Sequence, residues 1–438
     1  MITHPDPATL DKAASLVTGW PINVDTVLDG MLARRQAAKD RNIFFPAAVD
    51  IDWSRFNDFW GKLWNNIGSK DSNPPGGIDT KPAERALLAW AADLFGLPAD
   101  DWWGNLTTGG HDGNRAGLLA GRECFPTTQP PVAYYSTSAH YSIPKLLHEL
   151  AIEPVAVRAD AYGEMDYADL AQVLRPGVPA IVVATAGTTL TEAVDNPATI
   201  TAVLDAAGIT DRYLHVDAAL SGIPLALDGR LWTDGVDSFA VSVHKFFGVP
   251  GAGGLVVGRG KIRRRQQHIA YIASIDDSTT GSIDGLPPLM SWYAVATYGN
   301  DGHRARARAA RAVAAYATDQ LTAIGWPAWR HPHSFTVVFA TPPPTIRDTW
   351  PVAYDTDTAD DDEYHLICMP GVTRQQIDVF VQAMATALAT RIPNPIPPPD
   401  TPGVSSHAPR TAVIRAPDRT SNSTTRPNHD QMMNGTLP

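Results

Sequence analysis

The chain has little cysteine and no long apolar run. Its 438 residues include only two cysteines, Cys124 and Cys368, which are far apart and lack the spacing of metal ligands. This scarcity argues against a disulfide scaffold and a metal site, and it is typical of a reduced, cytoplasmic chain. The first twenty residues show no basic segment followed by an apolar core, so we expect no signal peptide. No apolar run approaches the roughly 20 residues of a membrane span, so we expect no membrane partner.

The chain also has fewer basic than acidic residues. The 35 lysines and arginines are outnumbered by 46 aspartates and glutamates, which gives a net charge of −11. A nucleic-acid partner is therefore not expected, because such proteins need a basic surface. The one basic run, Lys261–Arg265, is more typical of a solvated helix face than of a binding patch.

The length allows two or three domains with a large core. We predict an N-terminal helical segment over residues 1–52, a large domain over 53–300 and a smaller α/β domain over 301–391. Residues 392–438 are rich in Pro and then in Ser, Thr and Asn, with few apolar residues. Such a composition cannot bury enough apolar surface to fold, so it predicts a disordered tail.

Short apolar runs alternate with helical patterns through the predicted large domain, and further helical patterns follow it. The predicted strands are Val132–Tyr135, Pro154–Val157, Ala180–Ala184, Tyr213–Asp217 and Phe239–Val243. The predicted helices are Pro82–Phe95, Ser142–Leu150, Ala198–Ala207, Met290–Leu321 and Arg374–Leu388. This alternation predicts an α/β fold with a mostly parallel sheet covered on both faces.

One stretch combines a strand end, a lysine and flexible backbone. Ser242-Val243-His244-Lys245 ends an apolar run and opens into the glycine-rich segment 248–254. Ligands of open α/β sheets bind at the carboxyl ends of the strands. A partly desolvated lysine there has a lowered pKa and can react with an aldehyde, of which pyridoxal phosphate is the commonest cofactor. By itself the stretch also fits a surface lysine after a strand.

Three upstream features are compatible with the same cofactor, and each has a plainer interpretation. The turn Thr107–Asn114 precedes a helical run, as in phosphate sites at helix N-termini, but many glycine-rich turns bind nothing. His140 follows a strand and could stack on a flat ring or cap a helix. Asp217 ends another strand and could pair with a protonated pyridine nitrogen or cap the next turn.

Taken together and in this order, these motifs resemble those of the pyridoxal-phosphate-dependent group II amino-acid decarboxylases. The motifs that carry the resemblance are Thr108–Asn114, Ala186–Thr189, His215–Ala219 and Ser242–Lys245, with support from Tyr271–Asp276, Gly281-Ser282 and Val372–Arg374. Within that group the nearest match is to bacterial histidine decarboxylases and plant serine decarboxylases. The resemblance covers roughly residues 55 to 390.

The resemblance implies a fold-type I enzyme, like aspartate aminotransferase, that forms a homodimer and binds pyridoxal 5'-phosphate. It implies that Lys245 holds the cofactor covalently, that Asp217 pairs with the pyridine nitrogen, and that Tyr271 is the proton donor. By the same resemblance His140 and Ala219 lie on opposite faces of the ring, and Thr188 lies near its hydroxyl group. The phosphate would be held by Gly110, His111, Ser242 and His244.

Two stretches depart from the family pattern. Gly281–Leu286 carries Ile283 and Leu286 where the family usually has an Arg and a His. If those side chains shape the pocket, an aliphatic substrate such as valine or leucine becomes a candidate beside histidine. The glycine turn carries His111-Asp112 where Thr-Glu is common, a change that a phosphate site held by backbone donors can absorb.

We therefore expect a carboxy-lyase that converts an L-amino acid into its amine and carbon dioxide. An aminotransferase or an oxidative aldehyde synthase of the same fold is an alternative, against which Tyr271 speaks. A non-catalytic regulator or scaffold is a second alternative. A scaffold has no need to keep Lys245 and Asp217 together with His140 and Thr188.

Overall fold

The computed structural model describes residues 7–16, 22–74, 76–260, 267–354 and 363–388. The predicted tail from residue 392 and the basic run Lys261–Arg265 lie outside these ranges. No helix within them is long and apolar enough to cross a membrane.

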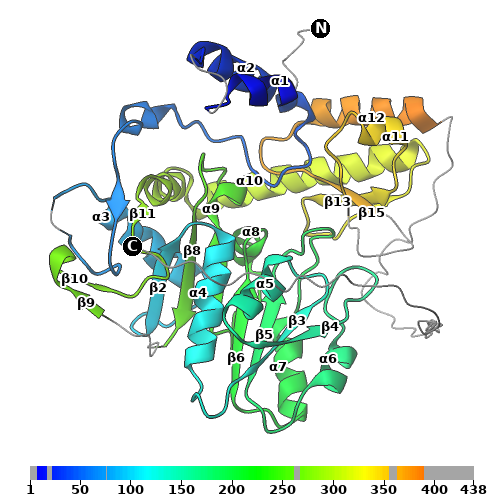
Figure 1. Cartoon of the computed structure of the whole chain (residues 1–438). Helices are drawn as coiled ribbons and strands as arrows, with labels where there is room; N and C mark the ends of the chain where they lie inside the picture. Colours follow the sequence, from blue (N-terminus) through cyan, green and yellow to red (C-terminus); the bar gives the residue numbers. More distant parts are fainter. Residues whose placement is uncertain (1–6, 17–21, 75, 261–266, 355–362, 389–438) are drawn as a thin grey trace, which may run out of the picture. The chain divides into compact units, whose positions relative to one another are not determined.

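A seven-stranded sheet organises the chain between residues 102 and 259 (Figure 1). Its strands are β2 (Trp102–Thr107), β3 (Val132–Ser136), β4 (Glu153–Val157), β5 (Ala180–Thr185), β6 (Arg212–Asp217), β7 (Ser238–Ser242) and β8 (Gly254–Arg259). Their order is β2-β8-β7-β6-β5-β3-β4. Neighbours from β7 to β4 pair in parallel, whereas β8 runs antiparallel to both β7 and β2. The predicted mostly parallel sheet is confirmed.

Helices cover both faces of this sheet. They are α3 (Lys81–Leu94), α4 (Gly110–Glu123), α5 (Ser142–Glu149), α6 (Tyr167–Val173), α7 (Pro197–Ala206), α8 (Gly222–Leu227) and α9 (Val243–Phe246). On β5, Ile181 and Val183 pack with α4 and α5, whereas Val182 and Ala184 pack into the core on the opposite face. Side chains of a strand alternate between its two faces, so a continuously apolar run such as β5 requires cover on both.

A smaller sheet follows, with strand order β12-β13-β15-β14. Its strands are β12 (Ala328–Trp329), β13 (Thr336–Ala340), β14 (Ala353–Tyr354) and β15 (Glu363–Ile367), accompanied by α10 (Leu286–Ala323), α11 (Pro344–Arg347) and α12 (Arg374–Leu388). This sheet has its own apolar core, to which Ile43 and Phe44 of the N-terminal segment contribute. The predicted domain boundaries at residues 52, 300 and 391 stay a prediction.

Short elements complete the fold. They are the helices α1 (Pro7–Ala13) and α2 (Val24–Ala38), the 3-10 turns Lys39–Arg41, Ser54–Phe59 and Ala270–Ile272, and the strands β1 (Asn65–Asn66), β9 (Gln267–Ile269), β10 (Ser274–Asp276) and β11 (Ile283–Asp284). β1 pairs with β11, and β9 pairs with β10 in a hairpin. Tyr271 lies at the turn of that hairpin.

Two predicted elements differ in detail from the structure. The helix predicted over Met290–Leu321 is interrupted at Gly299, whose φ of 59° and ψ of 177° are not helical. Glycine tolerates that conformation because it has no Cβ. The strand predicted over Phe239–Val243 ends at Ser242, and Lys245 lies in the one-turn helix that follows.

Candidate active site

Lys245 lies on α9, directly after the carboxyl end of β7. Its side-chain nitrogen forms no hydrogen bond or ion pair within the described part of the chain. Burial lowers the pKa of this amine, while the nearby carboxylates of Asp217 and Glu192 act in the opposite direction. A desolvated lysine without a fixed partner can present a neutral, nucleophilic amine.

Asp217 ends the neighbouring strand β6 and is 5% exposed. Its Oδ2 accepts a hydrogen bond of 2.8 Å from the side-chain amide of Asn114, and its Oδ1 accepts one of 3.1 Å from the backbone N–H of Ala219. Asn114 comes from α4, which packs on β6, β7 and β8. These bonds hold the carboxylate at the edge of the sheet where the strands end.

A fully buried histidine stands behind this pair. Nε2 of His215 lies 3.0 Å from Oδ1 of Asn114, and its Nδ1 lies 2.7 Å from the hydroxyl of Ser238. Burial lowers the pKa of His215 to about 4, so the ring is neutral, donates to Asn114 and accepts from Ser238. A Cβ on Gly117 would lie 2.3 Å from Cε1 of His215, so only glycine lets α4 approach the ring.

The predicted phosphate residues meet at the start of α4. Gly109 has a φ of 144°, and the next N–H, of Gly110, donates a 3.0 Å hydrogen bond to the hydroxyl of Ser242. A Cβ on Gly110 would lie 2.5 Å from that hydroxyl and 2.9 Å from Cβ of Ala219. The ring of His244 lies against this turn, with Cε1 3.7 Å from the place of a Cβ on Gly109.

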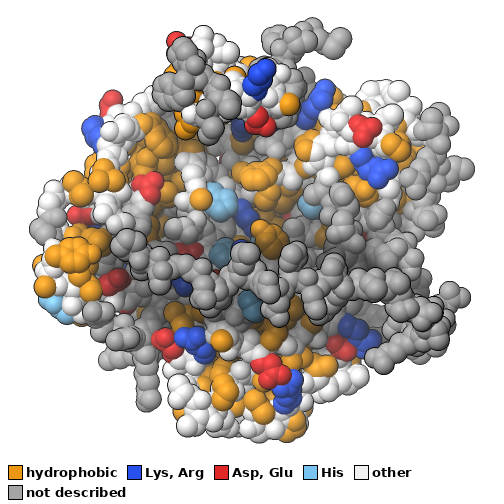
Figure 2. All heavy atoms as spheres, in the orientation of Figure 1, with side chains coloured by type: hydrophobic (Ala, Val, Ile, Leu, Met, Phe, Trp, Pro, Cys, Tyr) orange, Lys and Arg blue, Asp and Glu red, His pale blue; other side chains and the backbone are white. Residues whose placement is uncertain are grey.

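His140 also lies near this region. It follows β3 and is half-buried, and its Nδ1 accepts hydrogen bonds from the hydroxyl and the N–H of Ser142. Burial lowers the pKa of His140, Lys245 and His111 lower it further, and Asp217 opposes them. These interactions place His140 close to three other predicted site residues. Histidine and basic side chains gather near the centre of the face in Figure 2, around the position of α9 in Figure 1.

Two further predicted site residues make no hydrogen bond to Lys245 or Asp217 among the described residues. Thr188 is buried in the loop after β5, where its hydroxyl lies 3.0 Å from that of Thr191 and accepts the N–H of Ala193. Tyr271 is 82% exposed, and no hydrogen bond joins it to Lys245 or Asp217 in the described chain. The predicted role of each stays a prediction.

The two positions that depart from the family pattern are buried. Ile283 and Leu286 are 9% and 6% exposed, and both belong to the main apolar core together with Leu87. Ile283 also lines a small cavity beside Thr107 and Thr108. Packing is thus the interaction that these side chains make in the structure.

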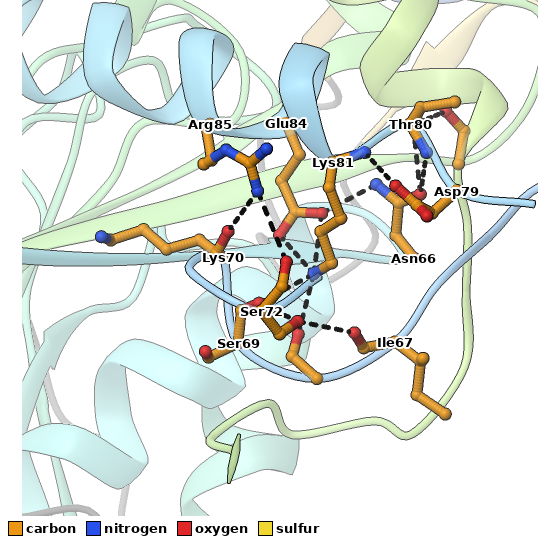
Figure 3. A network of polar contacts seen from close by, with 12 residues as sticks. Asn66, Ile67, Ser69, Lys70, Ser72, Asp79, Thr80, Lys81, Glu84 and Arg85 are labelled. Carbon is orange, nitrogen blue, oxygen red and sulfur yellow. Dashed lines mark hydrogen bonds and ion pairs between the residues drawn. The ribbon is translucent and has the colours of Figure 1, made fainter. Parts of the chain in front are cut away.

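A buried ion pair between Lys81 and Glu84, which the sequence analysis missed, holds the backbone at Gly68 and Ser69 (Figure 3). Nζ of Lys81 lies 3.1 Å from the carboxylate of Glu84 and donates to the carbonyls of Gly68 and Ser69. Oε2 of Glu84 also accepts a 2.7 Å hydrogen bond from the side-chain amide of Asn66. The signal in the sequence was a Lys and a Glu three positions apart on the apolar side of α3. Charged side chains are rarely buried unless they are paired, so this spacing indicates an ion pair.

Comparisons with known proteins agree with this geometry. Residues 84–323 match the model of the pyridoxal-dependent decarboxylase conserved domain. The chain belongs to this family. A histidine decarboxylase of Mesorhizobium japonicum is 35% identical over 370 residues, covering 82% of this chain and 96% of the relative. One of Pseudomonas entomophila is 37% identical over 340 residues, covering 75% and 82%.

Solved structures of amino-acid decarboxylases share the fold. L-methionine decarboxylase from Streptomyces sp. 590 superposes with a TM-score of 0.73 at 22% identity, covering 84% of this chain and 96% of that one. Glutamate decarboxylase from Lactobacillus brevis gives 0.69 at 17% identity, covering 83% and 92%. The predicted fold-type I architecture is confirmed. The protein is a pyridoxal-phosphate-dependent amino-acid decarboxylase, so the predicted carboxy-lyase class and cofactor are confirmed too.

The residues at the sheet edge fit this cofactor. The cradle at Gly110, which a single Cβ would fill, is of a kind that holds a phosphate against backbone N–H groups. The amine of Lys245, which has no partner among the described residues, fits its aldehyde, and the anchored carboxylate of Asp217 fits its pyridine nitrogen. When bound, the cofactor supplies a carbonyl for an amine to attack and a cationic ring that takes up the electron pair left by departing carbon dioxide.

Proposed function

We propose that this decarboxylase converts L-histidine into histamine and carbon dioxide. The observation that carries the proposal is the likeness to histidine decarboxylases, with 35% identity over 96% of the Mesorhizobium japonicum enzyme. The burial of Ile283 and Leu286 in the apolar core gives further support, because a change of core packing can leave the substrate unchanged.

An aliphatic L-amino acid such as valine or leucine is the second candidate. It is favoured by the same two positions, where apolar side chains replace the usual Arg and His. Ile283 lines a cavity beside the glycine turn, so a change there could reach the substrate pocket through Thr107 or Thr108. An apolar pocket separates such substrates by only about 1–3 kcal/mol per methylene.

We further propose the roles of the site residues. Lys245 would carry the cofactor, Asp217 would pair with its pyridine nitrogen, and His140 and Ala219 would enclose the ring. Gly110, His111, Ser242 and His244 would hold the phosphate, and Thr188 would lie near the ring hydroxyl. Tyr271 would return a proton to the α-carbon.

A homodimer is part of this proposal. Tyr271 is 82% exposed, whereas a proton donor needs a closed, water-poor surrounding. Helix α2 leaves Leu28, Met31 and Leu32 at least half exposed. A second copy of the chain could cover both surfaces, and light scattering of the purified protein would test the assembly.

The test of function is a product screen. Purified protein with added pyridoxal phosphate is given each common L-amino acid, and amines, carbon dioxide, aldehydes and keto acids are measured. Histamine as the main product is the expected result. An aliphatic amine as the main product would replace histidine by the second candidate. Aldehyde or keto acid in place of amine would overturn the proposal in favour of an oxidative or transaminating enzyme.

A further inference from the structure

One carboxylate bridges the glycine turn and the loop that carries Tyr271. Asp112 lies in the first turn of α4 and is 6% exposed. Its Oδ2 accepts a 3.1 Å hydrogen bond from the backbone N–H of Thr108, in the glycine turn. Its Oδ1 accepts a 2.8 Å hydrogen bond from the hydroxyl of Thr279, just beyond the hairpin of β9 and β10.

The same stretch of loop is held by two neighbours. Nη1 of Arg115, one helical turn after Asp112, donates a 3.2 Å hydrogen bond to the carbonyl of Thr279. The amide of Asn105 on β2 donates one of 3.1 Å to the carbonyl of Asp277. Thr279 therefore receives contacts from two residues on one face of α4, and its hydroxyl is the group bonded to the carboxylate.

Strand β10 of the hairpin has a second, independent anchor. The N–H of Ser69 donates a 2.8 Å hydrogen bond to the carbonyl of Ile275 on β10. The carbonyl of Ser69 is held in turn by the buried amine of Lys81 (Figure 3). In the described part of the chain this anchor bonds to Lys81 of α3 and makes no hydrogen bond to the glycine turn. The loop is thus anchored through Asp112 and through Ser69. The anchor through Asp112 bonds directly to the glycine turn, where the cofactor phosphate fits.

We propose that Asp112 is a positioning residue that couples cofactor binding in the glycine turn to order in the Tyr271 loop. A phosphate fixes the backbone of the turn, and the N–H of Thr108 then fixes one oxygen of Asp112. The other oxygen holds Thr279 and thereby the base of the hairpin. The inference extends the proposed function, because it gives the loop of the proposed proton donor a link to the cofactor.

Coupling of this kind is reciprocal, so it can be measured as loop order or as cofactor affinity. If the cofactor raises the equilibrium constant for loop ordering by some factor, ordering of the loop raises the affinity for the cofactor by the same factor. A hydrogen bond to a charged group is strong enough for a factor of about ten. A merely structural role of Asp112 would loosen the loop equally with and without cofactor.

The test measures chymotrypsin cleavage after Tyr271 by mass spectrometry, in the cofactor-free protein and with saturating pyridoxal phosphate. In the wild type we expect the cofactor to slow cleavage about tenfold. Pyridoxal, which lacks the phosphate, should give little protection. Thr279→Val should abolish most of the protection and weaken pyridoxal phosphate binding by a similar factor. Asp112→Ala should do the same, and Thr279→Val should add nothing in that background.

Thr280→Val is the matched control, because the hydroxyl of Thr280 has no hydrogen-bond partner among the described residues. It should keep wild-type protection. Thr279→Val with wild-type protection and wild-type affinity would overturn the proposal, as would faster cleavage to the same extent with and without cofactor. If Asp112→Ala does not fold, Thr279→Val decides alone. No amino acid is added, so the outcome is independent of the proposed substrate and of the proton-donor role of Tyr271.

Discussion

The side-chain amide of Asn114 joins a buried histidine to the carboxylate at the end of β6. It accepts a hydrogen bond from His215 over 3.0 Å and donates one to Asp217 over 2.8 Å. Because the Oδ1 of Asn114 can only accept, the ring of His215 sets which way the amide faces. The carboxylate is thus oriented by a chain of bonds that starts at Ser238.

Loss of this orientation should lower activity without unfolding the protein. Asn114→Ala removes one of two hydrogen bonds to a buried charge, each worth about 1.5–3 kcal/mol, so we expect a 10- to 100-fold loss in kcat/KM. The visible absorption of the bound cofactor should titrate at a lower pH, because a misplaced carboxylate stabilises the pyridinium less. Unchanged kinetics and an unchanged titration would show that Asp217 is held well enough by Ala219.

Replacement of the site lysine should abolish turnover. Lys245→Ala removes the half-buried amine on which the charge of Asp217 acts, so the purified variant should form no amine and no lysine-linked chromophore. Lys145→Ala, on the exposed face of α5, is the control and should retain full activity. Substantial amine production by Lys245→Ala would contradict the assignment of this residue.

The buried pair of Figure 3 predicts a large stability effect. Lys81 and Glu84 are 1% and 3% exposed, so Lys81→Met leaves an uncompensated carboxylate in the interior. We expect a loss of about 3–5 kcal/mol in the free energy of unfolding, measured by urea denaturation. The double variant Lys81→Met/Glu84→Gln should recover part of that loss, since it removes the unpaired charge. Equal stabilities of the single and double variants would argue against the pair.

Acid should destabilise the fold through His365 on β15. Burial lowers the pKa of His365 to about 4, below the ordinary value of 6.5. Between these values the unfolded chain binds a proton that the folded chain does not, so its contribution to stability is complete above pH 6.5 and falls as the pH drops toward 4. The unfolding free energy of His365→Leu should therefore fall less between about pH 7.5 and 4.5 than that of the wild type, by about 2–3 kcal/mol.

The control is His148→Leu, which makes the same substitution at an exposed position of α5. The comparison is made between variants because buried carboxyl groups act in the opposite direction, as burial raises the pKa of Asp195 to about 7. A wild-type pH dependence in His365→Leu would show that the pKa of this ring is the same in the folded and the unfolded chain.

The sequence alone was sufficient for the mostly parallel sheet and, through the resemblance to a known family, for the cofactor. Continuous apolar runs such as Ala180–Ala184 predict strands that are covered on both faces, because successive side chains of a strand point to opposite faces of the sheet. Strand ends at Asp217 and Ser242 could be placed at one edge, because parallel strands end together.

Tertiary structure alone decided the contacts between segments far apart in the chain. The bonds of Asn114 to His215 and of Asp112 to Thr279 join residues separated by 101 and 167 positions. Each of these side chains has a plausible local role in a cap or turn, so no pattern in the sequence selects the distant partner. Packing of α4 against the sheet and of the Tyr271 loop against α4 creates both contacts, because buried polar groups must find partners wherever the fold brings them.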